Sequence, residues 1–339
     1  AHTPSTEPGP TAPAAARVGI NPAWPYNGKA RVALGTRAMV VSGSPIASDV
    51  GRSILLAGGN AVDAAVAVGF ALAVVHPEAG NLGGGGFMVF RMADGATAAL
   101  DFRETAPGRA THDMYLDRGG EQTTLSDKGP LAAGVPGSVA GLVEAHHRFG
   151  RLPFSAIIEP AIRLAEEGFI VDEYRSRSID GYRAWLYTFA PSRRYFLPDN
   201  GQAPAPGTRW TQADLGRTLE AIRDRGRDGF YQGWVADSIV AEMDRGGGLI
   251  SHEDLTTYRA LWRDPIEIHY RGHTIYSMPP ASSGGVTLGL ILNILEGYGK
   301  LPPFGSPELL HREAEAMRRA FTDRNTYLGD PAFVQMPLV

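Results

Sequence analysis

The stretch from Gly83 to Pro107, GGGGFMVFRMADGATAALDFRETAP, is the part of the sequence that decides most about the fold. Residues 87–93 and 96–102 each resemble a β-strand, and the Asp94-Gly95 pair between them is typical of a tight hairpin turn. Four glycines precede the hairpin, and Arg103 follows its second strand. The stretch therefore predicts an antiparallel hairpin that carries an arginine at a strand end.

Arg103 is the main candidate for substrate binding. Its guanidinium presents a rigid fork of donors that matches a carboxylate bidentately, so an arginine held at a strand end suits an anionic substrate. The alternative is a structural salt bridge with Asp101, Glu104 or another carboxylate. Composition and spacing favour neither interpretation over the other.

The glycine run Gly83–Gly86 invites comparison with a phosphate-binding loop. Such a loop needs a following Gly-Lys-Ser/Thr and a helix N-terminus, whereas this run precedes a strand. We therefore expect a loop that needs unusual backbone angles or a close approach of neighbouring chain.

Three other motifs have simpler explanations than catalysis. Glu144 and His147 have the spacing of a di-iron helix motif, but no second copy is evident, so no metal site is predicted. Ser282-Ser283-Gly284-Gly285 lacks the Gly-x-Ser-x-Gly of a nucleophile elbow, and Ser283 is expected to cap the following helix. Asp323-Arg324 is expected to contribute to a structural ion pair, each residue with another partner.

The rest of the chain predicts helices around hairpins. Ser44-Pro45 is expected to begin a helix, and Asn60 to cap an apolar helix over 61–75 that lies buried across a sheet. Helices are also predicted at 142–149 and 160–167, after a capping box at Thr211, at 234–243, after Ser251, and at 286–296 and 307–327. A second hairpin is expected within 266–278, and an irregular aromatic-rich segment, packed onto the body by its rings, over 172–207. This order has no βαβ rhythm and argues against a doubly wound parallel sheet.

Composition excludes several classes of function. The chain has 339 residues and no cysteine, which excludes disulfides, thiolate metal sites and a cysteine nucleophile. Its net charge of -4 gives no general attraction to nucleic acid or to an anionic membrane surface, and no apolar run has membrane-spanning length. The chain begins with Ala1, and residues 1–30 are interpreted as the disordered leader of an exported protein.

A series of motifs, in order, resembles the large subunit of γ-glutamyltranspeptidase. They are Gly58–Ala65, Asn81–Phe87, Asp101–Pro107, Gly134–Gly137, Met278–Gly285, Asp323-Arg324 and Tyr327–Pro331. The resemblance runs from about Ala38 to the C-terminus.

The resemblance implies an α+β fold, the four-layer αββα sandwich of the N-terminal nucleophile hydrolases, with residues 31–339 forming the large-subunit part of one such domain. It implies that a small subunit from the same precursor completes the domain and supplies a nucleophilic N-terminal Thr, so no catalytic residue is expected in this chain. It assigns Arg103 to the α-carboxylate of a small γ-glutamyl substrate such as glutathione, with no cofactor. The leader that follows Ala1, rather than the resemblance, is the basis for expecting the enzyme in the bacterial periplasm or outside the cell. The alternatives are a cephalosporin or glutaryl acylase, a poly-γ-glutamate hydrolase, or a non-catalytic binding homologue.

Overall fold

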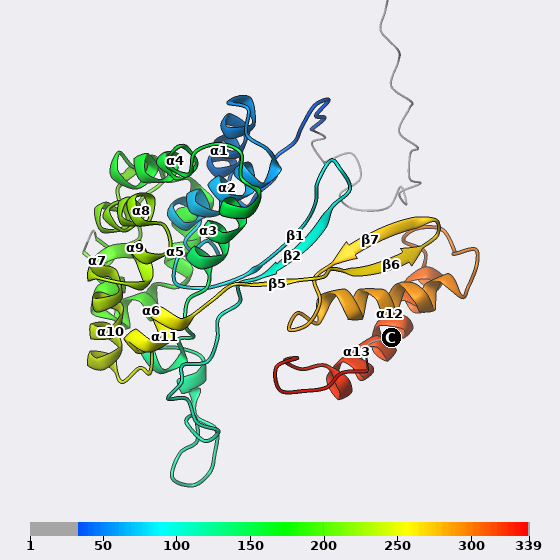
Figure 1. The fold of residues 1–339 in the computed structure, drawn as a ribbon. Coiled ribbons are helices and arrows are strands. Elements are labelled where there is room, and N and C mark those ends of the chain that lie inside the picture. Colours follow the sequence, from blue (N-terminus) through cyan, green and yellow to red (C-terminus); the bar gives the residue numbers. More distant parts are fainter. Residues whose placement is uncertain (1–32, 199, 338–339) are drawn as a thin grey trace, which may run out of the picture. The chain divides into compact units, whose positions relative to one another are not determined.

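The computed structural model describes residues 33–198 and 200–337, which divide into two compact units. The larger unit runs from Leu34 to Asp264, and the described part of the other comprises Ala33 and residues 265–337 (Figure 1). The leader predicted for residues 1–30 lies outside the described residues. The assignment of residues 31–339 to a single domain stays a prediction.

The predicted hairpin supplies two strands of a three-stranded antiparallel sheet in the larger unit, in the order β1-β2-β5. Strand β1 (Phe87–Arg91) pairs with β2 (Thr97–Asp101), which places Phe87 opposite Asp101. On its other edge β2 pairs with β5 (Leu261–Arg263), which places Asp101 opposite Leu261. Gly95 adopts a φ of 93° in the turn, a conformation that glycine adopts without steric cost. The hairpin prediction is confirmed, and Arg103 lies just beyond the end of β2.

Helices make up most of the larger unit (Figure 1). A second, two-stranded antiparallel ribbon pairs β3 (Phe169–Ile170) with β4 (Arg209–Trp210). The helices are α1 (Pro45–Leu56), α2 (Ala61–Val75), α3 (Ser138–Phe149), α4 (Phe154–Glu166), α5 (Glu173–Gly181), α6 (Arg183–Thr188), α7 (Ala190–Phe196), α8 (Ala213–Arg225), α9 (Asp228–Tyr231), α10 (Trp234–Gly246) and α11 (His252–Thr257).

Helix α2 lies in the core, as its apolar sequence predicts. Its main neighbours are α1, α3 and α4, so it packs among helices and not across a sheet as expected. Asn60 caps it in a reciprocal box with Asp63. The fully buried Asp63 carboxylate also accepts hydrogen bonds from the backbone N–H groups of Arg151 and Leu152, which ties the start of α2 to the loop between α3 and α4.

Two local helix signals were wrong because tertiary contacts override them. Pro160 lies inside α4 and not at its start, because α4 buries an apolar face on both sides of the proline, including Ile157 and Ile162. Thr211 does not cap α8. Gln212 occupies the cap position, and its buried side chain donates to the Val74 carbonyl at 2.7 Å.

The segment 172–207 is predicted to be irregular, and this is wrong for most of it. The three short helices α5, α6 and α7 lie within residues 173–196. Asp172 caps α5 by accepting a hydrogen bond from the Arg175 backbone N–H at 2.6 Å, a signal that the aromatic composition obscured.

The C-terminal unit contains the second predicted hairpin and two helices. Strands β6 (Ile266–Tyr270) and β7 (His273–Ser277) pair across a turn in which Arg271 and Gly272 both have positive φ. Helix α12 (Gly284–Glu296) packs against β6 and against α13 (Pro307–Tyr327), which Ser306 caps. Helices combined with antiparallel strands confirm the α+β class. In the parts of the chain that the structure describes, no helix has the length and apolarity needed to cross a membrane.

Candidate substrate-binding site

Arg103 is exposed where the chain leaves the sheet. The last paired residue, Phe102, exchanges backbone hydrogen bonds with Gly86 at 3.0 and 3.2 Å. The Arg103 backbone N–H then donates to Oδ1 of Asp101 at 3.1 Å, and its Cζ lies 6.0 Å from the centroid of the Phe87 ring. The backbone of Arg103 is therefore fixed while its side chain faces solvent.

Asp101, one of the carboxylates with which Arg103 could pair, already has another arginine as its partner. Oδ2 of the buried Asp101 accepts from Nε of Arg263, on β5, at 2.9 Å. Among the described residues of the larger unit, the Arg103 guanidinium forms no ion pair. Of the two interpretations left open by the sequence, the structural salt bridge is the one that this arrangement does not support.

Close packing accounts for three of the four glycines in the loop, Gly84–Gly86, whereas a β-carbon on Gly83 would meet no atom within 4 Å. The Gly84 N–H donates to Oδ1 of Asn81 at 2.7 Å, and the Gly84 carbonyl accepts from Gly137 and Ser138 at 2.7 and 2.9 Å. A β-carbon on Gly85 would lie 2.5 Å from the Phe102 carbonyl oxygen. The predicted close approach is confirmed, and the Gly84 and Gly86 N–H groups are used internally, which argues against phosphate binding.

The segment Gly134–Gly137 packs against the residues on either side of Arg103, Phe102 and Thr105. Val135 and Thr105 form a two-way antiparallel bridge, with N–H to oxygen distances of 2.8 and 3.4 Å. A β-carbon on Gly137 would lie 2.0 Å from the Phe102 carbonyl oxygen. Three motifs that are separate in the sequence thus meet around one exposed arginine.

Tyr258 is a neighbour of Arg103 that sequence reasoning missed. Its hydroxyl donates to the Arg103 carbonyl at 2.8 Å, across 155 residues of sequence. Tyr258 ends the short helix α11, and its position there gives no local signal for such a contact.

The other candidate residues lie elsewhere and have structural roles. Glu144 accepts a hydrogen bond from Trp262 Nε1 at 2.8 Å. No group of three His, Asp or Glu side chains among the described residues is placed to hold a metal ion.

In the C-terminal unit, Ser283 does hold the cap position of α12, but its Oγ accepts from Nε of Arg324 at 3.0 Å and makes no cap bond. The prediction that Asp323 or Arg324 forms a structural ion pair is wrong for the described residues of this unit. Asp323 is exposed, and Arg324 donates to Ser283 and Asn325 and not to a carboxylate.

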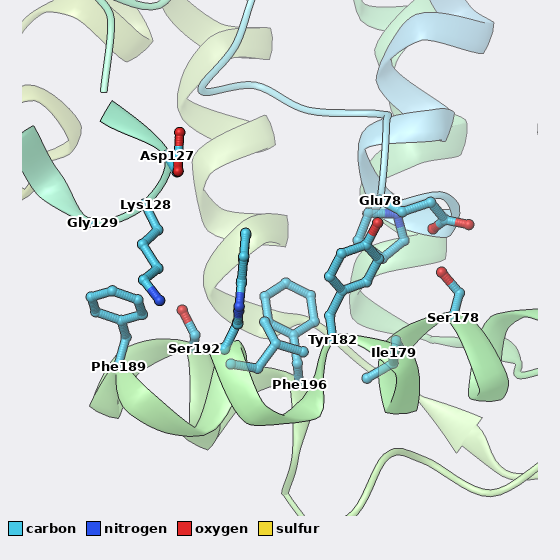
Figure 2. Close-up of a pocket in the computed structure, with 13 residues that line it drawn as sticks. Glu78, Asp127, Lys128, Gly129, Ser178, Ile179, Tyr182, Phe189, Ser192 and Phe196 are labelled. Carbon is cyan, nitrogen blue, oxygen red and sulfur yellow. The ribbon is translucent and has the colours of Figure 1, made fainter. Parts of the chain in front are cut away.

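A cavity of about 450 Å³ lies elsewhere in the larger unit, between the loop at Asp127–Gly129 and helices α5–α7 (Figure 2). Four of the expected packing aromatics, Tyr182, Trp185, Phe189 and Phe196, line it. Tyr182 and Trp185 are about half exposed, so they contribute less to the core than expected. Neither Arg103 nor any residue of its surrounding motifs lines this cavity.

The chain is similar to known proteins over most of its length. Residues 47–339 match the model of the gamma-glutamyltranspeptidase family. The glutathione hydrolase proenzyme of Escherichia coli is 46% identical over 89% of the chain, and an acylase ACY 1 proenzyme of Pseudomonas is 44% identical over 90%. The chain spans 52% and 56% of these relatives, about half their length.

A solved structure extends the likeness to three dimensions. Helicobacter pylori gamma-glutamyltranspeptidase superposes with a TM-score of 0.88 at 44% identity, over 91% of this chain and 88% of that one. The α+β fold of the N-terminal nucleophile hydrolase type is therefore shared. Sequence, family model and fold agree, and the chain belongs to the gamma-glutamyltranspeptidase family.

Proposed function

We propose that this chain is the large subunit of an enzyme that cleaves γ-glutamyl amide bonds, as in glutathione. Membership of the family, and relatives named glutathione hydrolase proenzymes, support the activity. The word proenzyme in those names supports a precursor that is cut into two subunits. The observation that carries the proposal within this chain is the exposed Arg103, whose backbone is fixed and whose guanidinium has no carboxylate partner among the described residues of its unit.

In the proposed reaction, the N-terminal Thr of the small subunit attacks the γ-carbonyl of the substrate, with its own α-amine as base. The amine leaves, a γ-glutamyl ester forms on the Thr, and water or the amine of an amino acid or peptide then takes the glutamyl group. Arg103 binds the α-carboxylate by a bidentate, charge-assisted pair. Its role is to position the γ-carbonyl for attack, and no catalytic group, cofactor or metal is assigned to this chain.

The proposed setting is the bacterial periplasm or the extracellular medium. The net charge of -4 gives the chain no general attraction to nucleic acid, so the proposed partners are the small subunit and a small γ-glutamyl compound.

A related acylase is the second candidate, because a relative at 44% identity carries that name. A glutaryl group is a γ-glutamyl group without its α-amine, so both substrates present the same carboxylate to Arg103. The two activities therefore differ in recognition of the ammonium, and comparing a γ-glutamyl anilide with a glutaryl anilide separates them. A non-catalytic homologue would turn over neither.

The test is the kinetics of Arg103→Ala in the complete, matured protein. Removing one partner of a hydrogen-bonded charge pair costs at least about 2–3 kcal/mol, so KM for a γ-glutamyl anilide should rise at least roughly 30- to 150-fold, with a smaller change in kcat. Arg118→Ala, which removes another exposed arginine of the same unit, is the control. An unchanged KM in Arg103→Ala would refute the proposed role. Intact mass and N-terminal sequencing should find a second polypeptide that begins with Thr.

A further inference from the structure

The Arg103 carbonyl is held by a tyrosine from a distant part of the chain. Between the pairing of Phe102 with Gly86 and that of Thr105 with Val135, the backbone at Arg103 and Glu104 makes no ladder hydrogen bond among the described residues. Asp101 accepts from the Arg103 N–H, and the Tyr258 hydroxyl donates to the Arg103 carbonyl at 2.8 Å. These two side chains set the path of the chain where the guanidinium leaves it.

Tyr258 is itself rigidly placed. Its side chain is buried, and its ring stacks parallel to that of Tyr231, with centroids 6.0 Å apart and an interplanar angle of 2°. The Tyr231 hydroxyl donates to the Pro136 carbonyl at 2.7 Å and accepts from the Ala140 N–H at 3.3 Å. Tyr231 thereby connects Tyr258 to the segment that begins α3.

Arg227 contacts both tyrosines, through the ring of Tyr231 and the carbonyl of Tyr258. Its Cζ lies 4.7 Å from the centroid of the Tyr231 ring, and its Nη2 donates to the carbonyls of Leu255, Thr256 and Tyr258 at 2.8–3.1 Å. Burial is the main cause that raises the pKa of both tyrosines, so both hydroxyls remain protonated donors across the physiological range.

Gly137 is the residue that lets Tyr258 reach Arg103. A β-carbon at this position would lie 2.2 Å from the Tyr258 hydroxyl oxygen and 2.0 Å from the Phe102 carbonyl oxygen. No side chain larger than hydrogen is compatible with both contacts. The glycine at the end of the Gly134–Gly137 motif thus leaves room for the hydrogen bond from the Tyr258 hydroxyl to the Arg103 carbonyl.

We propose that Tyr258 is a positioning residue for substrate binding, because its hydroxyl fixes the backbone from which Arg103 reaches the substrate carboxylate. This inference rests on the proposed role of Arg103. Tyr258 touches neither the substrate nor the scissile bond in this scheme. Its removal should therefore weaken recognition of the carboxylate and leave bond cleavage nearly unaffected.

The test uses Tyr258→Phe in the complete, matured enzyme and two substrates. A γ-glutamyl anilide carries the α-carboxylate, and a γ-aminobutyryl anilide lacks only that group. Loss of one neutral hydrogen bond should raise KM for the first about fivefold, with kcat within about twofold, and leave kcat/KM for the second unchanged. Tyr195→Phe is the control, since its hydroxyl accepts from the Leu215 backbone elsewhere in the same unit.

The outcomes separate this inference from the proposed function. Equal losses on both substrates would show a general structural role and overturn the inference, as would an unchanged KM in a folded Tyr258→Phe enzyme. In Arg103→Ala, adding Tyr258→Phe should cause no further loss, and an additive loss would also contradict positioning through Arg103. If Arg103→Ala itself leaves KM unchanged, the proposed function fails first.

Discussion

Asp63 provides a quantitative test of how the larger unit is held together. Its carboxylate is fully buried and accepts from the backbone N–H groups of Asn60 at 2.9 Å and of Arg151 at 3.0 and 3.1 Å, with a longer bond of 3.4 Å from Leu152. Asp63→Ala removes every one of these acceptors at once. Each buried donor left unsatisfied costs about 1–3 kcal/mol, so the variant should lose about 3–5 kcal/mol.

Thermal unfolding of the complete, matured enzyme measures this loss. For a domain of this size, 1 kcal/mol corresponds to about 2–4 °C, so Tm should fall by roughly 10 °C. Asp94→Ala is the matched control, because the exposed Asp94 carboxylate accepts a single local bond from the Ala96 N–H at 3.0 Å. Its loss should stay below about 1 kcal/mol. Equal shifts for the two variants would refute the anchoring role of Asp63.

Two further predictions concern the support of Arg103. Gly137→Ala should lower Tm and raise KM for a γ-glutamyl anilide, because its β-carbon would meet Phe102 and Tyr258. Gly181→Ala is the control, since the new β-carbon would lie in open space and Tm should hardly change. Similar Tm values for the two variants would contradict the tight packing around Gly137. Burial raises the folded pKa of Tyr231 and Tyr258 above the unfolded value of about 10, so their contribution is complete below about pH 10 and is lost as pH rises beyond it. The free energy of unfolding, measured with urea from about pH 9 to about pH 11, should therefore decrease as the pH rises. The double variant Tyr231→Phe/Tyr258→Phe should show a smaller decrease. An equal decrease in the double variant and the wild type would contradict the role of these two tyrosines.

Local signals in the sequence predicted the elements that depend on neighbouring residues. Asn60 and Ser251 cap their helices as expected, and the turns at Asp94-Gly95 and Arg271-Gly272 join the two hairpins. These features need only a few adjacent side chains. The sequence therefore contains all of the information that specifies them.

Features set by distant contacts were not predictable in this way. Pro160 looks like a helix start, but burial of the face that includes Ile157 extends α4 toward the N-terminus. Arg103 could be predicted as a candidate because it follows a hairpin formed by neighbouring residues. Tyr258 lies 155 residues away in the sequence, and no local pattern predicts its contact with Arg103. The close approach that requires glycine at position 137 involves Phe102 and Tyr258, which only the folded chain brings next to it.

The recognition of the substrate carboxylate by Arg103 is tested most directly by a ratio of specificities. In the matured wild-type enzyme, kcat/KM for a γ-glutamyl anilide should exceed that for a γ-aminobutyryl anilide, which lacks only the carboxylate, by roughly 30- to 150-fold. In Arg103→Ala the ratio should fall to near one, mainly through loss on the γ-glutamyl substrate. A ratio that Arg103→Ala leaves unchanged would show that the carboxylate is recognised elsewhere and would contradict the proposed role.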